Sequence, residues 1–116
     1  MRDMYEVLDR WGAWAASDNS GIDWKPIAAG FKGLLPYGKM SRIQCDDDEG
    51  LFIDGCIAFL GRYRPESYEL LIAHFVVGLS LRCIAKRCKC SEGKIRKNMQ
   101  LAMGVVEGMI LSITMR

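Results

Sequence analysis

The chain has 116 residues, of which 50% are hydrophobic and 26% charged, so it can bury the core of one domain, with or without an N-terminal appendage. This composition excludes global disorder, and no run approaches the roughly 20 apolar residues of a membrane helix. Acidic residues near the N-terminus argue against a signal peptide, and the five cysteines then favour reduced thiols in a cytosol over disulfides.

The net charge of +2 hides an uneven distribution along the chain. Between Arg82 and Lys97 there are seven Lys or Arg residues and one acid, whereas the rest of the chain carries nine basic and thirteen acidic residues. A basic face on an otherwise acidic molecule indicates a polyanion partner for the C-terminal half. A solvated helix surface is the alternative that charge alone leaves open.

The first 50 residues predict one clear helix followed by less regular chain. Residues 2–16 repeat apolar side chains at helical spacing, and the helix should stop at "SDNSG" (17–21), whose residue types favour turns. Residues 22–36 are rich in Gly and Pro but too apolar for a free linker, which predicts a short packed helix with turns. Residues 37–50 show no sustained period and predict a flexible segment.

From about residue 49 onward, the sequence predicts four helices. The first runs over 49–62, the second begins at Pro65 and ends at Gly78, and Ser80 and Ser91 are the expected N-caps of the third and fourth. The positions expected to face the core are 53, 56, 57 and 60; 71, 72, 75 and 76; 81, 84, 85 and Cys88; and 95, 99, 102, 106, 109/110 and 113.

The predicted fold is therefore all-α, because no strand alternation and no internal repeat is present. We expect a tryptophan-rich helical and irregular extension at 1–36, a flexible loop or linker at 37–50, and a helical body at 51–116 that contains a helix-turn-helix at 80–100.

The stretch "SLRCIAKRCKCSEGKIRKNMQ" (80–100) has the spacing of a helix-turn-helix, because a three-residue gap separates two N-capped helices. With Ile95 facing the core and about 100° per residue, Lys97 and Gln100 point outward and Lys94 and Arg96 flank them. Such side chains suit phosphates and base edges. The candidate DNA contacts are Lys86, Arg87, Lys89, Ser91, Glu92, Lys94, Arg96, Lys97 and Gln100.

This stretch resembles the C-terminal DNA-binding region of bacterial sigma factors. Ser80, Leu81, Ile84, Ala85 and Lys86 match its first helix, and Ser91, Ile95 and Arg96 match its second. Gly93 departs from the sigma pattern, which has a side chain there. With "RWGAWAASDNSGIDWKPIAAGFKGLLP" and "LFIDGCIAFLGRYRPESYELL", nearly the whole chain resembles the Q-type late-gene antitermination proteins of lambdoid bacteriophages, in the phage-21-like branch.

The resemblance implies a phage-encoded protein in the cytoplasm of a bacterial host. Such proteins bind a DNA element at a late promoter, load onto paused RNA polymerase, and suppress pausing and termination, in this branch at the RNA exit channel. The implied partners are double-stranded DNA and the host RNA polymerase elongation complex with sigma, and a second copy of the chain on DNA stays open. The competing hypothesis is a helix-turn-helix regulator that acts only at initiation.

A zinc site is the main alternative interpretation of the cysteines. Its candidate ligands, Cys83, Cys88, Cys90 and His74, lack the paired C-x2–4-C spacing of structural zinc sites. A thiol nucleophile lacks a recognisable base, so the sequence predicts no enzyme, metal or cofactor.

Two further groups have a structural and a functional interpretation. The acidic run Asp46–Glu49 could bind Mg²⁺, but a solvated loop that caps the next helix fits better. Trp11, Trp14, Trp24 and Phe31 are either core residues or a partner interface for RNA polymerase.

Overall fold

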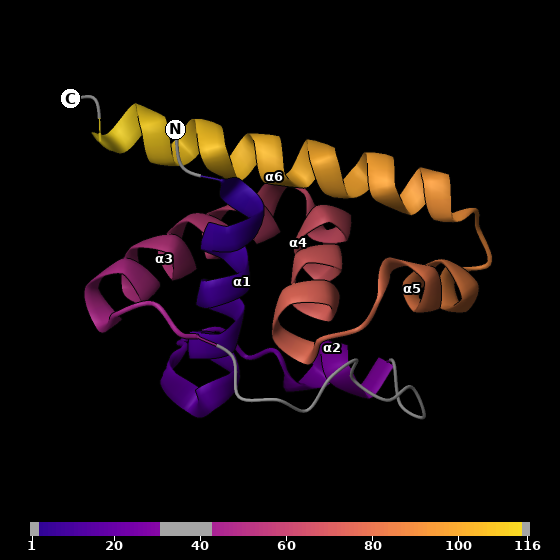
Figure 1. The fold of residues 1–116 in the computed structure, drawn as a ribbon, viewed down its shortest axis with the longest axis horizontal. Coiled ribbons are helices and arrows are strands. Elements are labelled where there is room, and N and C mark those ends of the chain that lie inside the picture. The colour runs from indigo at the N-terminus through magenta and orange to yellow at the C-terminus, as the bar shows by residue number, and fades with distance from the viewer. Residues whose placement is uncertain (1–2, 31–42, 115–116) are drawn as a thin grey trace.

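The computed structural model describes residues 3–30 and 43–114, and every regular element in these two ranges is helical. The elements are α1 (Met4–Trp14), the π-helix η1 (Ala15–Asn19), α2 (Lys25–Gly30), α3 (Asp47–Tyr63), α4 (Pro65–Leu71), the π-helix η2 (Ile72–Val77), α5 (Leu81–Cys88) and α6 (Glu92–Thr114). In Figure 1, α6 lies along one side of the molecule, and α1, α3 and α4 lie beneath it. Within the described ranges, no helix has the length and apolar character needed to cross a bilayer.

The N-terminal helix is part of the core. Asp3 caps α1 by accepting a hydrogen bond from the amide of Tyr5, and the apolar stripe predicted from the sequence faces inward. Trp11 is 0% exposed and Trp14 is 2% exposed. Of the two interpretations left open for these tryptophans, the core position is therefore confirmed and the partner interface is wrong, because α1 packs against α3 and η2.

Two carboxylates on α3 hold the N-terminal segment in place. Asp54 is 7% exposed and accepts hydrogen bonds from Trp11 Nε1 at 3.2 Å, Ser20 Oγ at 2.5 Å and the Gly21 amide at 3.1 Å. At the start of the same helix, Asp47 accepts a hydrogen bond from Trp14 Nε1 at 2.9 Å. Both indole N–H groups are thus satisfied inside the fold, so α1, η1 and α3 form one unit.

The acidic run Asp46–Glu49 forms the N-cap and first turn of α3. Asp46 is the N-cap, and its side chain accepts a hydrogen bond from the Glu49 amide at 2.8 Å. The capping interpretation is confirmed, whereas the flexible segment predicted to reach residue 50 is wrong at its C-terminal end, because α3 starts at Asp47. The remaining part of that prediction, through residue 42, and Phe31 lie outside the described residues.

The helix predicted over 65–78 is confirmed, although its second half is π-helical. Pro65 begins α4, and η2 ends at Gly78, which adopts a left-handed conformation with φ of 91°. The four residues expected to face inward, at 71, 72, 75 and 76, are buried. Gly78 suits this position because a side chain would make the left-handed backbone unfavourable, and the turn sends the chain into α5.

Replacing Gly12 with alanine is expected to lower the free energy of unfolding by about 1–3 kcal/mol, because the added methyl group would overlap the backbone carbonyl of Phe75. Gly55→Ala is the matched control: Gly55 also lies within a helix, but nothing lies within 4 Å of an added Cβ. This control should raise stability by about 0.5–1 kcal/mol through backbone entropy. Urea denaturation of both variants checks the pair, and equal effects would disprove the close helix contact.

Candidate nucleic-acid interface

The helix-turn-helix begins with a capped helix. Ser80 is the N-cap of α5 and accepts a hydrogen bond from the Cys83 amide at 3.1 Å, as predicted. The helix ends at Cys88, and its C-cap Lys89 is left-handed, with a φ of 57°. The amide of Cys90 donates to the carbonyl of Ala85 at 3.0 Å, which closes the turn. Ser91 then caps α6 by accepting from the Lys94 amide at 3.1 Å, so the two predicted caps are confirmed.

The basic residues of α5 lie on two different faces. Ile84 and Ala85 are buried, and at about 100° per residue Lys86 lies opposite them while Arg82 and Arg87 lie on the two flanks. Arg82 was missed as a candidate contact, although its four-residue spacing to Lys86 was visible in the sequence. Arg87 lies on the flank, where its Nε donates a hydrogen bond to the carbonyl of Gly30 at 3.1 Å and ties α5 to α2.

Cys88 is exposed, so its predicted packing against the core is wrong. It is the last residue of α5 and lines a groove between α4, α5 and α6. Among the described residues, no group of three His, Cys, Asp or Glu side chains is placed to hold a metal ion.

The first four turns of α6 have a buried face and an exposed face. Ile95, Met99, Ala102 and Val106 are buried, as the periodicity predicts, and Lys97 and Gln100 point away from them. Gly93 on this outer side leaves open space where a side chain would stand. The seam ends earlier than predicted, because Ile113 is 50% exposed rather than buried.

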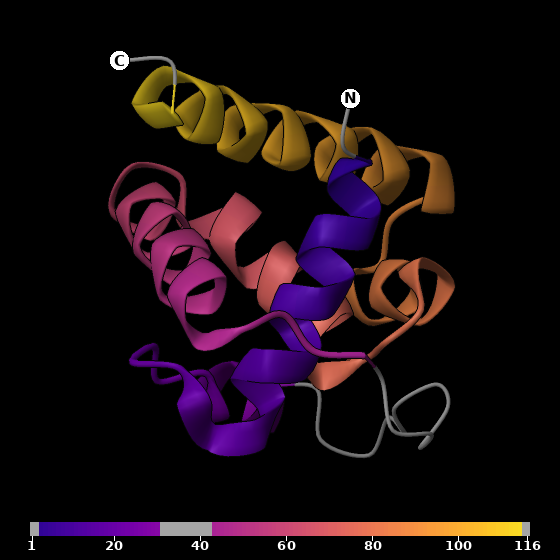
Figure 2. The same ribbon diagram turned by 60° about the vertical axis from the view of Figure 1, so that its left-hand side comes forward.

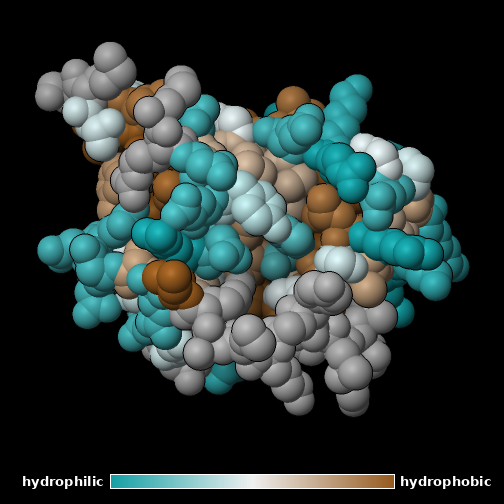
Figure 3. Space-filling view, viewed as in Figure 1, coloured by the Kyte–Doolittle hydropathy of each residue, from teal (hydrophilic) through white to brown (hydrophobic). Residues whose placement is uncertain are grey.

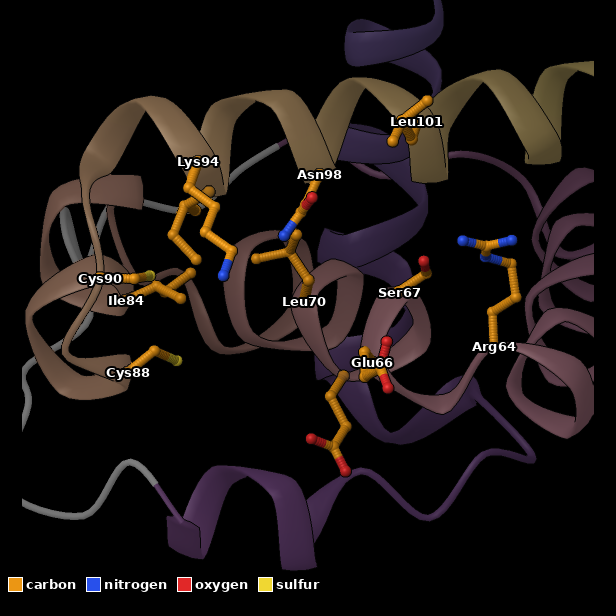
Figure 4. Close-up of a pocket in the computed structure, with 12 residues that line it drawn as sticks. Arg64, Glu66, Ser67, Leu70, Ile84, Cys88, Cys90, Lys94, Asn98 and Leu101 are labelled. Atoms are coloured by element: carbon orange, nitrogen blue, oxygen red, sulfur yellow. The ribbon is translucent and has the colours of Figure 1, made fainter.

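Lys94 and Arg96 lie on opposite flanks of α6. Arg96 forms an ion pair with Glu92 at 3.2 Å on the surface of its own helix, where both side chains are exposed. Lys94 instead lines a groove between α4, α5 and α6 with a volume of about 360 Å³. Figure 4 shows the Lys94 and Asn98 side chains pointing into this groove, with Arg64 entering from its other end.

Glu66 and Glu69 of α4 also line this groove. On this flank their negative charges offset the positive charges of Arg64 and Lys94. The outer residues of α6, Gly93, Lys97 and Gln100, include a cation and no acid. The electrostatics therefore favour the outer face as the DNA-facing side. In Figure 3, hydrophilic side chains cover the right-hand end of the molecule, where α5 and the start of α6 lie.

His74 is hydrogen-bonded to the segment that precedes α5. Its Nδ1 lies 2.7 Å from the carbonyl of Leu79, which can only accept, so Nδ1 carries the proton. In the neutral ring Nε2 then accepts from the Tyr5 hydroxyl at 2.7 Å. Burial, and after it the charge of Asp9, raises the pKa of the Tyr5 phenol, which keeps that donor protonated. Both ring nitrogens of His74 thus have hydrogen-bond partners within the fold.

Lys89→Gly is expected to raise the free energy of unfolding by about 1 kcal/mol, because glycine adopts the left-handed conformation without the steric cost that lysine carries. If Lys89 also contacts a phosphate, the same variant should bind DNA more weakly with a shallower salt dependence. Thermal unfolding and a salt titration of DNA binding measure the two effects separately. A loss of stability would contradict the cap geometry.

Comparison with known proteins identifies relatives over the whole chain. The family model described as "Phage antitermination protein Q" matches residues 1–116. A probable antitermination protein Q from Acyrthosiphon pisum secondary endosymbiont phage 1 is 47% identical over 99% of this chain and 78% of its own length. The antitermination protein Q of Escherichia phage 933W is 45% identical over 100% and 81%, and the prophage homolog QuuD of Escherichia coli K12 is 43% identical over 100% and 91%.

Two solved structures share the fold. Transcription antitermination factor Q21 superposes with a TM-score of 0.68 at 17% identity, covering 96% of this chain and 89% of that one. A second structure, Q21 in complex with Q21-binding-element DNA, gives 0.66 at 16% identity, covering 96% and 91%. The all-α arrangement is therefore that of a known antitermination factor.

Proposed function

The chain belongs to the phage antitermination protein Q family, and from this premise we propose that it binds a DNA element at a late promoter, loads onto paused RNA polymerase and suppresses pausing and termination. We also propose that the protein acts at the RNA exit channel, because a terminator hairpin needs space in that channel to form. The relatives are named as antitermination factors and not as enzymes, which supports a regulatory role without catalysis.

The single observation that carries the DNA-binding step is the outer face of the helix-turn-helix. Lys97 and Gln100 stand exposed opposite the buried Ile95, beside an open position at Gly93. The proposed contacts are Lys86, Lys89, Ser91, Glu92, Lys94, Arg96, Lys97 and Gln100, to which the exposed Arg82 is added. Arg87 has a partner within the fold and is the weakest member of the predicted set.

Q21, which shares the fold, has been solved in complex with Q21-binding-element DNA, and this supports DNA binding by the present chain. The helix N-terminus of α6 adds the partial positive charge that favours a phosphate close to Ser91. Lys94 would reach DNA only by leaving the α4 groove that it lines, so its contribution depends on that rearrangement.

Transcription in vitro tests the proposal. The template carries the late promoter of the phage that encodes the protein, followed well downstream by an intrinsic terminator, and purified host polymerase with sigma transcribes it. Read-through should rise when the protein is present and stay unchanged on a template whose promoter region is scrambled. Unchanged termination together with altered initiation would instead support the regulator that acts only at the promoter.

A further inference from the structure

Two cysteines border the turn between α5 and α6 and share one groove. Cys88 is the last residue of α5, and Cys90 lies in the turn that follows. Both line the groove between α4, α5 and α6, and Figure 4 shows both side chains at its α5 end, pointing into it. Cys88 is exposed, Cys90 is half-buried, and both are free thiols. DNA binding by the outer face of α6 makes no use of either sulfur.

The backbone of Lys89 places the two thiols on the same side. In a continuous α-helix, side chains two residues apart point about 200° away from each other. Lys89 has a φ of 57° and a ψ of 45°, which is close to the mirror image of the α-helical backbone. The chain therefore reverses its turn at Lys89, and the side chains before and after it enter one groove.

The same conformation suits a disulfide between the two cysteines. A helical backbone, of either hand, sets the Cα atoms on the two sides of one residue about 5.4 Å apart. Disulfides join residues whose Cα atoms are roughly 4.4–6.8 Å apart. Cys88 and Cys90 can therefore be joined without a large movement of the backbone.

The groove is accessible, and its thiols are the ones most open to oxidation. In both Figure 1 and Figure 2 the link from α5 to α6 lies at the edge of the molecule. The groove volume of about 360 Å³ admits hydrogen peroxide, which is little larger than water. Cys83 does not line this groove. Burial raises the pKa of Cys56, and burial followed by the charge of Glu49 raises the pKa of Cys45, so these two thiols stay protonated and unreactive.

We propose that Cys88 and Cys90 form an oxidation site, at which hydrogen peroxide converts the two thiols into a disulfide within the turn. The exposed Cys88 sulfur attacks one peroxide oxygen, the O–O bond breaks, and the leaving hydroxide takes up the thiol proton as water. The Cys90 sulfur then attacks the sulfenic acid on Cys88, forms the S–S bond and releases a second water. The two thiols together lose two electrons and two protons, and one peroxide is reduced to two waters.

The disulfide acts on the turn from which α6 begins. In the reduced protein the Cys90 amide donates to the carbonyl of Ala85 at 3.0 Å, and the next residue, Ser91, caps α6. Joining Cys90 to Cys88 pulls on both interactions. The consequence for DNA rests on the proposed function, in which Lys89 and Ser91 are DNA contacts. We expect oxidation to weaken binding to the DNA element about fivefold, which is the size of the loss of one N-cap.

Mass spectrometry of the full chain tests the disulfide. Reduced protein is treated with one equivalent of hydrogen peroxide, freed of it, denatured and alkylated with iodoacetamide. The reduced chain should take a label on each of its five cysteines, whereas the oxidised chain should leave Cys88 and Cys90 unlabelled and be about 2 Da lighter before labelling. Trypsin cuts after Arg87, Lys89 and Lys94, so the oxidised chain should release residues 88–89 joined to residues 90–94.

Two variants control the chemistry. Cys83→Ser is the matched control, because Cys83 lies on the same helix but outside the groove, and this variant should give the same pair of joined peptides. Cys90→Ser should stop at a sulfenic acid on Cys88, which dimedone traps. A joined pair that contains Cys83, dimers linked by a disulfide, or full labelling after peroxide would overturn the proposal.

Fluorescence anisotropy on the DNA element tests the consequence. The oxidised protein should bind about fivefold more weakly than the reduced protein, and dithiothreitol should restore the affinity. Cys88→Ser should bind equally well before and after peroxide. If the reduced protein does not bind the element, the proposed function fails, while the peptide masses still decide whether the disulfide forms. If the disulfide forms and the affinity is unchanged, oxidation does not regulate DNA binding and that part of the inference is overturned.

Discussion

Replacing Asp54 with alanine is expected to lower the free energy of unfolding by about 3 kcal/mol or more. The carboxylate accepts hydrogen bonds from three donors, of which Trp11 Nε1 is fully buried, and each buried donor left without a partner costs about 1–3 kcal/mol. The loss would release Ser20 and Gly21 together with α1, so η1 should become mobile before the rest of the protein unfolds. Urea denaturation followed by tryptophan fluorescence measures the change, because the two buried indoles report directly on this region.

Two variants calibrate the Asp54 result. Asp48→Ala changes an exposed carboxylate on the first turn of the same helix and should cost about 0.3–1 kcal/mol, since only the interaction with the helix dipole is lost. Asp54→Asn keeps the shape and one accepting oxygen, so its loss should be smaller than that of the alanine variant. If Asp54→Ala is as stable as Asp48→Ala, the hydrogen bonds to Asp54 do not hold the N-terminal segment.

Lys97→Ala is expected to weaken binding to the DNA element about 10- to 100-fold, which corresponds to about 1–3 kcal/mol for a side chain that reads a base. Lys97 projects opposite the buried Ile95 and no ion pair within the described residues competes for it. Fluorescence anisotropy on specific and random duplexes measures the effect at several salt concentrations. A loss on the specific duplex alone assigns Lys97 to a base, and an equal loss on both assigns it to a phosphate.

Lys94→Ala tests which side of α6 faces the DNA, because Lys94 is one turn away on the same helix but lines the groove with α4. Its effect on DNA binding should be smaller than that of Lys97→Ala. A larger effect would mean that the DNA lies along the α4 side despite Glu66 and Glu69, and would overturn the docking orientation proposed here.

Local sequence was sufficient to predict α5, the turn after it and the start of α6. Ser80 and Ser91 as caps, Gly78 as a stop and the inward positions from Ile95 to Val106 are set by hydrogen bonds and side-chain spacing within a few residues, so they can be read without the rest of the fold. The all-α class follows from the same short-range information.

Tertiary packing decided the features for which spacing along one helix is not enough. An amphipathic face shows that Trp11 and Trp14 can be buried, but only packing against η2 and α3, with Asp47 and Asp54 at the right positions, makes them core residues and not an interface. Conversely, Ile113 continues the inward period of α6 but is half-exposed.

The sequence by itself therefore determined where the helices lie, which ends are capped and where the positive charge gathers. The tertiary structure decided which apolar faces find a partner, that Arg87 holds α2 through the carbonyl of Gly30, and that an open apolar groove remains between α3 and α6. The physical reason is that caps and helical periods depend on neighbours within about four residues, whereas burial depends on which distant segment covers a face.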